Sequence, residues 1–479
     1  MPPQANRHND GFRSCFKNIF VVINNFTNIQ ELSSYHLNIS LVLYAFYSSR
    51  CFPTPQERCH MIHTVELSKQ IDNDTFNQIL SAYSFHSVKS PNKCQTNFIC
   101  TDFSNQGINK ITLCRYDKAG DHEPVKQYRP YYSILIILNL AKLARQNVNR
   151  ISLYQAQKCD DFSKISNGFR EVMMEITSGD IELQELCNIE SYTTRRIDFC
   201  CQFKVEEPQL YIYLLNRGRF PSRGNHYNEK YEDSCYIVGG KIEDTKRGSI
   251  TINIYDKQAE MKATKNHGKG YTEEDLSEAE NVLRVEVQAF RRKMIYLKDK
   301  YKYPDRCLKH YLNISLAKEL LLDYIKEIAG TADYYTHRAL KSKVNGLQPK
   351  KVHQSTKDKI LDILDDLNGN AKQRPTLQEY IKQKPEKERR NLKDTLKTMD
   401  DKGINPIAIP NMIDGSTVHI HQPLQSVYSL IEGYFVNISS IVSLDNRLEA
   451  DCLIEEDEEA MTDDEVKEDF NQGYVQNFL

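Results

Sequence analysis

Three segments between Thr194 and Phe290 place acidic, basic and amide side chains at alternate positions. They read RIDFCCQF at 196–203, SITINIYDK at 249–257 and LRVEVQA at 283–289. Apolar and polar residues alternate in each with a period of two, which predicts β-strands with one face buried in a core. The opposite faces carry more ionisable groups than solubility requires. We therefore interpret that polar sheet surface as a candidate active site.

Two carboxylates suggest what this surface could do. Asp198 and Glu286 lie on the polar faces of separate strands, and Glu260 follows the second strand closely. Carboxylates that come together on a sheet repel each other, and they would hold Mg²⁺ or Mn²⁺ through their oxygens. The alternative is that each is a surface acid paired with a nearby arginine. The pattern alone favours this second interpretation.

A tyrosine and two cations could complete the chemistry. Tyr236 is expected on the polar side because its neighbours Cys235 and Ile237 would face the core. A tyrosine with a pKa of about 10 is ionised to only about one part in a thousand at pH 7, so as a nucleophile it needs a metal ion or cation beside it. Lys257 and Arg196 are cations on the same predicted surface. They would also neutralise charge developing on a scissile phosphate.

Composition narrows the class of protein. The 479 residues, 40% of them apolar and 27% charged, fit a chain of two or three ordinary soluble domains. The 13 cysteines include no CxxC pair, which favours reduced thiols in a cytoplasmic protein and argues against zinc. No apolar run reaches the roughly 18–20 residues that span a bilayer, so no membrane partner is expected. No small-residue cleavage site follows a basic start, which argues against a signal peptide.

The charge is unevenly distributed and suggests a polyanionic partner. Residues 449–479 hold twelve acidic residues against Lys467, a net −11, so the total of −2 leaves the rest of the chain near +9. A basic body with an acidic tail fits nucleic acid, although any chain of this length can be mildly basic. Basic residues interleave with tyrosines in 291–306, which suits a nucleic-acid backbone and its bases. The alternative is a solvated helix face. The candidate DNA-binding residues are Arg291, Arg292, Lys293, Lys298 and Lys300.

The chain as a whole predicts an α+β fold. We expect an antiparallel sheet built from two similar α/β halves with helices on one face, followed by a helical region and an acidic disordered tail. The helical region has an S/T-x-x-E capping box at Thr376–Glu379 and a C-terminal glycine cap at Gly403. It resembles a helix-turn-helix module, and a purely structural cap is the alternative. The predicted divisions are a poorly structured extension at 1–60, an N-terminal half at 61–190, a catalytic half at 191–310, the helical region at 311–425 and the tail at 426–479.

Several segments together resemble a known family. They are TRRIDFC at 194–200, CYI at 235–237, TINIYDK at 251–257 with Glu260 after it, LRVEV at 283–287, GTADYY at 330–335 and GINPIAIP at 403–410. Their order and spacing resemble those of the Rep-trans family. These are replication initiation proteins of rolling-circle plasmids and mobile elements in Firmicutes, related to the conjugative relaxases of integrative elements. The resemblance covers about Met61 to Pro410.

The resemblance implies a metal-dependent nicking enzyme. Tyr236 would attack a phosphodiester of origin DNA, single-stranded or cruciform, keeping the 5′-phosphate and freeing a 3′-OH that primes a polymerase. Asp198 and Glu286, with Glu260, would bind Mg²⁺ or Mn²⁺. The implied partners are a host helicase and polymerase, and the oligomeric state stays open, a homodimer included. The alternatives are a conjugative relaxase with the same chemistry and a DNA-binding regulator without catalysis.

Two choices of site residue remain open. The family's Gly-Ser-Arg-like run is matched only in part by Gly239-Gly240-Lys241, so Tyr255 is the alternative nucleophile. His419-Ile420-His421 resembles the His-hydrophobe-His metal motif of a different nickase class, with Tyr428 and Tyr434 after it. That class sets its histidines on a central strand inside a full domain. Only a short apolar stretch and the acidic tail follow here, so surface histidines are expected.

Overall fold

The computed structural model describes residues 61–89, 95–116, 131–145, 153, 160–218, 224–227, 234–239, 249–265, 271–348, 350, 352–369, 374–413, 416–418 and 423–435. Four predictions therefore fall outside the described residues. They concern the extension at 1–60, the glycine and lysine at 240–241, the histidines at 419 and 421, and the acidic tail from 436 onward.

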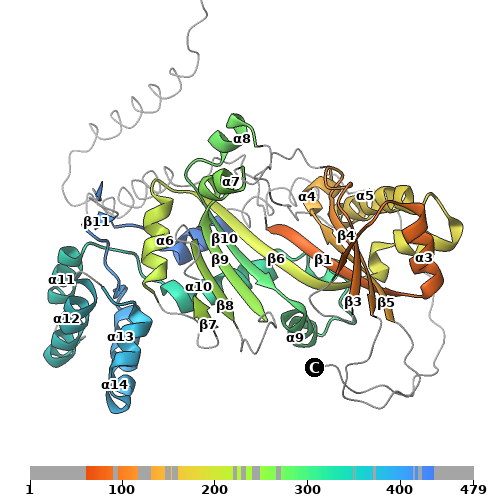
Figure 1. The fold of residues 1–479 in the computed structure, drawn as a ribbon. Helices are drawn as coiled ribbons and strands as arrows, with labels where there is room; N and C mark the ends of the chain where they lie inside the picture. The colour runs from red at the N-terminus through yellow and green to blue at the C-terminus, as the bar shows by residue number, and fades with distance from the viewer. Residues whose placement is uncertain are drawn as a thin grey trace, which may run out of the picture. The chain divides into compact units, whose positions relative to one another are not determined.

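Ten strands form one antiparallel sheet (Figure 1). Their order is β2-β3-β4-β5-β1-β6-β10-β9-β8-β7. The strands are β1 (Ile62–Ile71), β2 (His86–Lys89), β3 (Gln95–Cys100), β4 (Ile108–Tyr116), β5 (Tyr131–Leu138), β6 (Thr193–Lys204), β7 (Gly224–Tyr227), β8 (Ser234–Gly239), β9 (Ile250–Asp256) and β10 (Val282–Ala289). The three segments with alternating residues are β6, β9 and β10, as predicted.

The two halves of this sheet share one plan. In the first half, β1 is followed by helix α3 (Asn73–Ala82) and by β2 to β5; in the second, β6 is followed by α6 (Pro208–Asn216) and by β7 to β10. In both halves the first strand pairs with the last, and the remaining strands follow in descending order. The two first strands, β1 and β6, pair with each other in the middle. The predicted α+β fold of two similar halves is confirmed.

One face of the second half is apolar and carries helices. Helix α6 contacts β8 and β9, and α10 (Ile314–Ala329) contacts β6 and β10. On the first half, α3 contacts β5, α4 (Leu140–Leu143) contacts β1, and α5 (Asp160–Ile176) packs on α4. Burial of each large aliphatic side chain contributes about 1.5–3 kcal/mol, so this layer is the main source of stability. The apolar positions of the three alternating segments are all buried, as that pattern predicts: Ile197, Phe199, Cys201, Phe203, Ile250, Ile252, Ile254, Leu283, Val285, Val287 and Ala289.

The remaining elements are short or lie C-terminal to the sheet. They are η1 (Ile181–Cys187), η2 (Ile189–Ser191), α7 (Lys257–Lys265), α8 (Glu273–Glu278), α9 (Arg291–Tyr301), η3 (Leu308–Tyr311), α11 (His337–Asn345), α12 (Gln354–Asn368), α13 (Leu377–Gln383), α14 (Glu386–Asp401), β11 (Met412–Ile413) and β12 (Ser416–Thr417). In the part of the chain described, no helix is long and apolar enough to cross a membrane.

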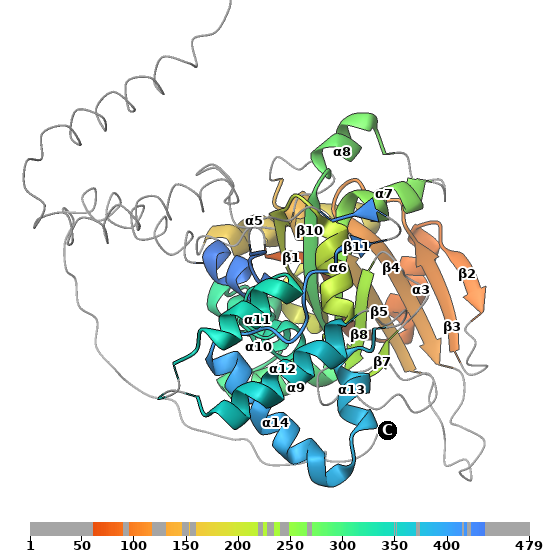
Figure 2. The same ribbon diagram turned by 90° about the vertical axis from the view of Figure 1, so that its left-hand side faces the viewer.

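Helices α11 to α14 share a core with α6 (Figure 2). Leu210 and Leu214 of α6 join Leu364 and Leu396 in one apolar cluster. The capping box predicted at Thr376–Glu379 forms at the start of α13. Gly403 follows α14 and has a φ of 63°. This left-handed conformation is typical of the C-terminal glycine cap that was predicted at Gly403. The helical region therefore packs on the sheet's own helix layer.

A buried arginine ties α6 to the helical region. The guanidinium of Arg217, just after α6, donates hydrogen bonds to the Leu367 carbonyl and to Asn368 Oδ1 at the end of α12. Asn368 Nδ2 in turn donates to the Pro406 carbonyl at 2.8 Å. The positive charge also faces the negative end of the α12 dipole. Arg217 therefore caps one helix while following another.

The fold continues past the predicted start of the tail. Residues 427–435 are helical, and Val427, Ile431 and Phe435 are buried. The ring of Tyr434 packs edge-on against Phe203 of β6, with centroids 5.5 Å apart. These apolar residues recur at helical spacing, which allows the segment to bury one side. The fold therefore extends at least ten residues past the predicted boundary at 425/426.

Candidate active site

The strand register places the predicted nucleophile and one predicted metal ligand in a single row across the sheet. Tyr236 on β8 lies opposite Asn253 on β9, and Asn253 lies opposite Glu286 on β10. Directly opposed residues project from the same face of a sheet. Because strands are about 4.8 Å apart, the Cα atoms of Tyr236 and Glu286 are about 10 Å apart. Asn253 Oδ1, between them, is buried with no hydrogen-bond partner in the described part of the chain.

Two further carboxylates lie on this face. Asp198 on β6 faces Gln288 on β10, two residues from Glu286. Such diagonal neighbours in an antiparallel pair are about 7–8 Å apart. On β1, Glu66 lies opposite Arg196 and therefore on the same face. The face thus carries acidic side chains on three adjacent strands, one of which, Glu66, the sequence analysis did not select.

Asp198 is paired with Arg196, as the surface-acid interpretation expected, but it is buried. Its side chain is 1% exposed, and Arg196 donates from Nε and Nη2 to its two oxygens at 2.6 Å each. Burial raises the pKa of Asp198 to about 7, and the charges of Glu286 and Glu66 add to this rise, although Arg196 opposes it. The ionised carboxylate therefore depends on a cation beside it.

Glu286 is held by Tyr255. The Tyr255 hydroxyl donates to Glu286 Oε1 at 2.6 Å, and Glu286 is 3% exposed. Burial alone would raise the pKa of Glu286, but His63, Arg284 and the Tyr255 hydrogen bond together bring it below its usual value. Burial and the charge of Glu286 raise the pKa of Tyr255 well above 10. Tyr255 therefore acts as a donor that stays protonated, which favours Tyr236 as the nucleophile.

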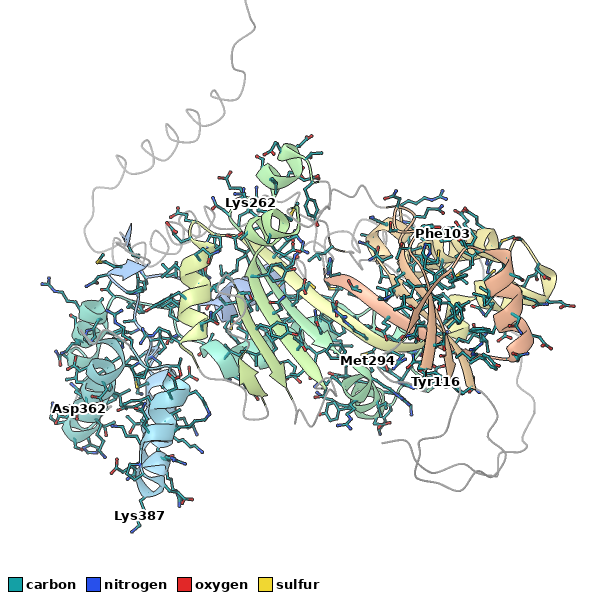
Figure 3. All side chains as sticks on the ribbon, viewed as in Figure 1. Phe103, Tyr116, Lys262, Met294, Asp362 and Lys387 are labelled. Carbon is teal, nitrogen blue, oxygen red and sulfur yellow. The ribbon has the colours of Figure 1, made fainter. Side chains whose placement is uncertain are left out.

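Lys257 and Glu260 form a pair at the start of α7. Lys257 Nζ lies 2.6 Å from Glu260 Oε2, and the Glu260 side chain is 40% exposed. Burial and the nearby Arg284 lower the pKa of Lys257, while Glu260 opposes that shift. One turn along the same helix, Lys262 (Figure 3) donates to the side-chain oxygen of Gln258. Glu260 thus serves as the partner of Lys257 in this structure.

Arg284 is a buried cation within the site. It has no exposed surface, and its Nη2 donates to Gln202 Oε1 at 2.8 Å. Burial alone would lower the pKa of Arg284, but Tyr255 and Glu286 raise it above its usual value. A buried guanidinium is costly unless anions balance it. Arg284 is the first polar residue of the alternating segment at 283–289, and no role was predicted for it.

His63 is the main residue that sequence reasoning missed. Its Nδ1 lies 3.6 Å from Glu286 Oε1, and its side chain is 35% exposed. The packed surroundings lower its pKa to about 4, with Arg284 and Lys257 adding to the effect and Glu286 opposing it. The imidazole is therefore neutral at pH 7. A single histidine near the start of a strand offers no periodic signal, and its contact depends on the register shift between Ile62 and Val65.

The donor set fits a divalent cation in chemical type. Asp198 and Glu286 supply the carboxylate oxygens that Mg²⁺ and Mn²⁺ prefer, and a cation could replace Arg196 as the counter-charge of Asp198. The predicted set of three carboxylates is not assembled, because Glu260 pairs with Lys257. Within the residues described, no three His, Cys, Asp or Glu side chains gather closely enough to hold a metal ion.

The start of α9 lies beside this site. Arg196, the partner of Asp198, places its guanidinium 5.3 Å from the centre of the Phe290 ring, and Phe290 immediately precedes α9. Arg291 and Arg292 are exposed, whereas Met294, labelled in Figure 3, is buried. The predicted DNA-binding helix therefore presents its first two arginines to solvent.

The other three predicted DNA-binding residues have partners within the protein. Lys293 Nζ lies 4.7 Å from the Tyr296 ring centre and 5.2 Å from that of Tyr324. Lys298 is 3.5 Å from an oxygen of the next residue, an aspartate. Lys300 pairs with the Glu319 carboxylate. Arg291 and Arg292 are thus the better placed of the five to contact a phosphate backbone.

The second nickase motif gains no support from the described residues. His419 and His421 lie outside them. Of the two tyrosines that follow, Tyr434 is buried against Phe203 on the core side of the sheet. Burial raises the pKa of Tyr428 above its usual value, as does Glu432.

Comparisons with protein-family models, with curated proteins and with solved structures find no match to this chain.

Proposed function

We propose that this chain is a replication initiation protein of the Rep-trans type. It would nick one strand of origin DNA with Tyr236 as nucleophile and leave a 3′-OH for rolling-circle replication. The observation that best supports this is the cross-strand row of Tyr236, Asn253 and Glu286. That row sets a partly exposed tyrosine on the same face as buried acids and cations. A face of this kind suits a phosphodiester and its counter-charges.

The proposed reaction is a transesterification at phosphorus. The Tyr236 oxygen loses its proton and bonds to the phosphorus, and the bond from phosphorus to the 3′ oxygen breaks. The leaving 3′ oxygen takes up a proton, so the products are a 5′-phosphotyrosine and a free 3′-OH. No oxidant or reductant is needed. Attack by a 3′-OH on the phosphotyrosine reverses the step and rejoins the strand.

The charged residues of the face have distinct roles in this proposal. Asp198 and Glu286 would hold the metal ion, and Tyr255 would orient Glu286 through its hydrogen bond. The chemistry supplied by bound Mg²⁺ or Mn²⁺ is neutralisation of charge on the scissile phosphate. Arg196 and Lys257 would add positive charge near the same phosphate. Glu260 is then a partner of Lys257 and only a candidate ligand.

The proposal also assigns partners. Arg291 and Arg292 at the start of α9 would bind the phosphate backbone of single-stranded or cruciform origin DNA. The freed 3′-OH requires a polymerase, and unwinding of the nicked strand requires a helicase, both supplied by the host. Such a protein works in the cytoplasm. A conjugative relaxase would use the same chemistry with other partners, whereas a DNA-binding regulator would use α9 and the helical region without cleavage.

The test is a covalent capture experiment. The full chain is incubated with single-stranded DNA from the origin of its own element, with Mn²⁺, Mg²⁺ or EDTA, and the adducted peptide is identified by mass spectrometry. We expect a metal-dependent adduct on Tyr236 in the wild type and none in Tyr236→Phe. Absence of any adduct would leave the DNA-binding regulator as the better description. An adduct that persists in Tyr236→Phe would remove Tyr236 from the role of nucleophile.

A further inference from the structure

We infer that Arg195, Arg291 and Arg306 together bind one phosphate group of a single DNA strand, beside the pair of Arg196 and Asp198. Neither Arg195 nor Arg306 has a role in the function proposed above. The anion site stands on its own contacts, whereas its assignment to DNA rests on the proposed function. It would hold one phosphate of the bound strand in place next to the nicking site.

Arg195 is the extra residue of an irregularity in β6. Glu66 pairs with Arg196 and Leu67 with Thr194, so Arg195 has no opposite residue on β1. An extra residue in a strand redirects side chains, and such bulges are common beside active sites. Arg195 Nε accordingly lies 3.7 Å from Glu66 Oε1, and the Arg195 side chain is 34% exposed. Both consecutive arginines of β6 therefore reach the polar face.

A backbone hydrogen bond places Arg306 at the start of the same strand. The Thr194 N–H donates to the Arg306 carbonyl at 2.9 Å. The loop before Arg306 is held by Tyr303, whose N–H donates to the Lys298 carbonyl at 3.0 Å and whose ring stacks on His310 with centroids 5.2 Å apart. The backbone at Arg306 is therefore fixed before any ligand binds, which lowers the entropic cost of binding.

Helix α9 brings the third arginine to this place. The helix contacts β6 (Figure 1), and the ring of its N-cap residue Phe290 lies against the Arg196 guanidinium. Arg291 is the first residue of α9 and is exposed. The side chain of Phe290 cannot accept hydrogen bonds from the N–H groups of the first turn, and the helix dipole makes this end positive. The start of α9 therefore adds to the attraction that the arginines exert on an anion.

The charge of Arg306 is repelled by the other two arginines of the cluster. Burial lowers the pKa of Arg306, and the charges of Arg291 and Arg195 lower it further. Arg306 Nη1 is buried, and no residue in the described part of the chain accepts a hydrogen bond from it. A buried donor without an acceptor destabilises a fold. An anion among the three guanidinium groups would supply the acceptor and relieve the repulsion.

The carboxylates near the cluster do not balance its positive charge. Five arginines come from β6, the start of α9 and the loop after it: Arg195, Arg196, Arg291, Arg292 and Arg306. Asp198 accepts hydrogen bonds from Arg196 with both oxygens, and Glu66 lies near Arg195. Asp305 is 63% exposed and lies 3.1 Å from His310. The surplus of positive charge favours an anionic ligand.

The place of the cluster suits DNA that crosses the sheet. Tyr236 lies on β8, and the strand order β8-β9-β10-β6 leads from it to Arg195. A DNA strand that meets Tyr236 with one phosphate would pass over β9 and β10 and reach the arginines with another. Guanidinium groups bind phosphate through pairs of parallel hydrogen bonds. Such a contact fixes the position of the strand and reads no base.

The first test contains no DNA. Urea unfolding of the full chain is measured in chloride and in inorganic phosphate at equal ionic strength. A ligand that binds only the folded chain stabilises it, so phosphate should raise the urea midpoint of the wild type but not that of Arg306→Gln or Arg195→Gln. The control is Arg170→Gln at an exposed position of α5, which should respond to phosphate as the wild type does. No gain in the wild type, or an equal gain in Arg306→Gln, would overturn the site.

The second test asks whether the bound phosphate belongs to DNA. Fluorescence anisotropy with a labelled oligothymidylate in EDTA should show about tenfold weaker binding to Arg306→Gln, and a slope of log K against log salt lower by about 0.7. Arg306→Lys keeps the charge but loses the planar fork, so it should weaken binding and leave the slope unchanged. Wild-type affinity in Arg306→Lys would refute a guanidinium contact.

The two tests together separate the sources of the phosphate. Loss of the phosphate effect in Arg306→Gln with unchanged DNA affinity would identify a site for free phosphate or a nucleotide and overturn the assignment to DNA. Neither readout requires cleavage. A chain that behaves as expected in both tests but forms no adduct on Tyr236 would keep this site and refute only the proposed nicking.

Discussion

Tyr255→Phe separates the two tyrosines of the face by role. The substitution keeps the ring, which packs in the site, and deletes only the hydroxyl that donates to Glu286 at 2.6 Å. No cavity forms, so the loss is that of a hydrogen bond to a charged acceptor, about 1.5–3 kcal/mol. If this whole free energy is lost from metal binding, Mn²⁺ affinity falls about 10- to 150-fold, because about 1.4 kcal/mol equals a factor of ten.

The same substitution should make stability depend on pH in a defined direction. The pKa of Glu286 is lowered in the fold, so its ionised form adds stability above the unfolded pKa, and this contribution is lost as pH falls through the folded pKa. Deletion of the Tyr255 hydroxyl removes part of that contribution. Wild type and Tyr255→Phe should therefore differ most near pH 7, begin to converge below the unfolded pKa of about 4.3, and coincide only below the lower folded pKa. Urea unfolding at a series of pH values measures the difference.

The covalent adduct provides the decisive readout. Tyr255→Phe should still form the adduct on Tyr236, at a lower rate that excess Mn²⁺ partly restores. Loss of the adduct in Tyr255→Phe together with its retention in Tyr236→Phe would exchange the two roles. Unchanged stability and unchanged Mn²⁺ affinity in Tyr255→Phe would show that the hydrogen bond to Glu286 contributes nothing.

Two further predictions concern the contact of Arg217 with α12 and the two exposed arginines at the start of α9. Arg217→Met removes the hydrogen bonds to the end of α12. This loss should lower the free energy of unfolding by about 2–4 kcal/mol. Part of the loss is offset because the variant no longer buries a charged guanidinium. The control is Arg338→Met at an exposed position of α11, which should change the free energy of unfolding by less than about 0.5 kcal/mol. Equal effects of the two substitutions in urea unfolding would show that the contact of Arg217 with α12 does not stabilise the fold. The double substitution Arg291→Gln with Arg292→Gln should weaken binding of single-stranded DNA and lower the slope of log K against log salt by about 1.4. An unchanged slope in fluorescence anisotropy would place the DNA elsewhere.

The strands of the site could be predicted because their pattern is local. Alternation along 196–203, 249–257 and 283–289 depends only on neighbouring residues, and β6, β9 and β10 form where it occurs. The same pattern put Asp198, Glu286 and Tyr236 on one face, and the strand register agrees. The capping box at Thr376–Glu379 was likewise a local signal.

The contacts of the site could not be predicted because they depend on register between distant strands. Glu66 and His63 enter the face only because β1 pairs with β6, and His63 also requires a bulge. The partner of Glu286, Tyr255 on the next strand, was equally hidden, whereas the pairing of Asp198 with a nearby arginine was one of the two interpretations that the sequence offered. The polar face was expected to be open, yet Asp198, Arg284 and Glu286 are buried.

The central pairing of β1 with β6 has a consequence for how the protein is made. Ile62 and Phe199, which pair there, are 137 residues apart in the chain. During synthesis at about 5–20 residues per second, β1 to β5 are complete roughly 3–10 s before β6 begins to be translated. Over that interval β1 is a sheet edge with unpaired backbone groups, where a wrong strand could add. His63 and Glu66 lie on that edge strand, and the site forms only after β6 and β10 of the second half have folded. A nascent or prematurely ended chain would therefore carry His63 and Glu66 but lack the rest of the site.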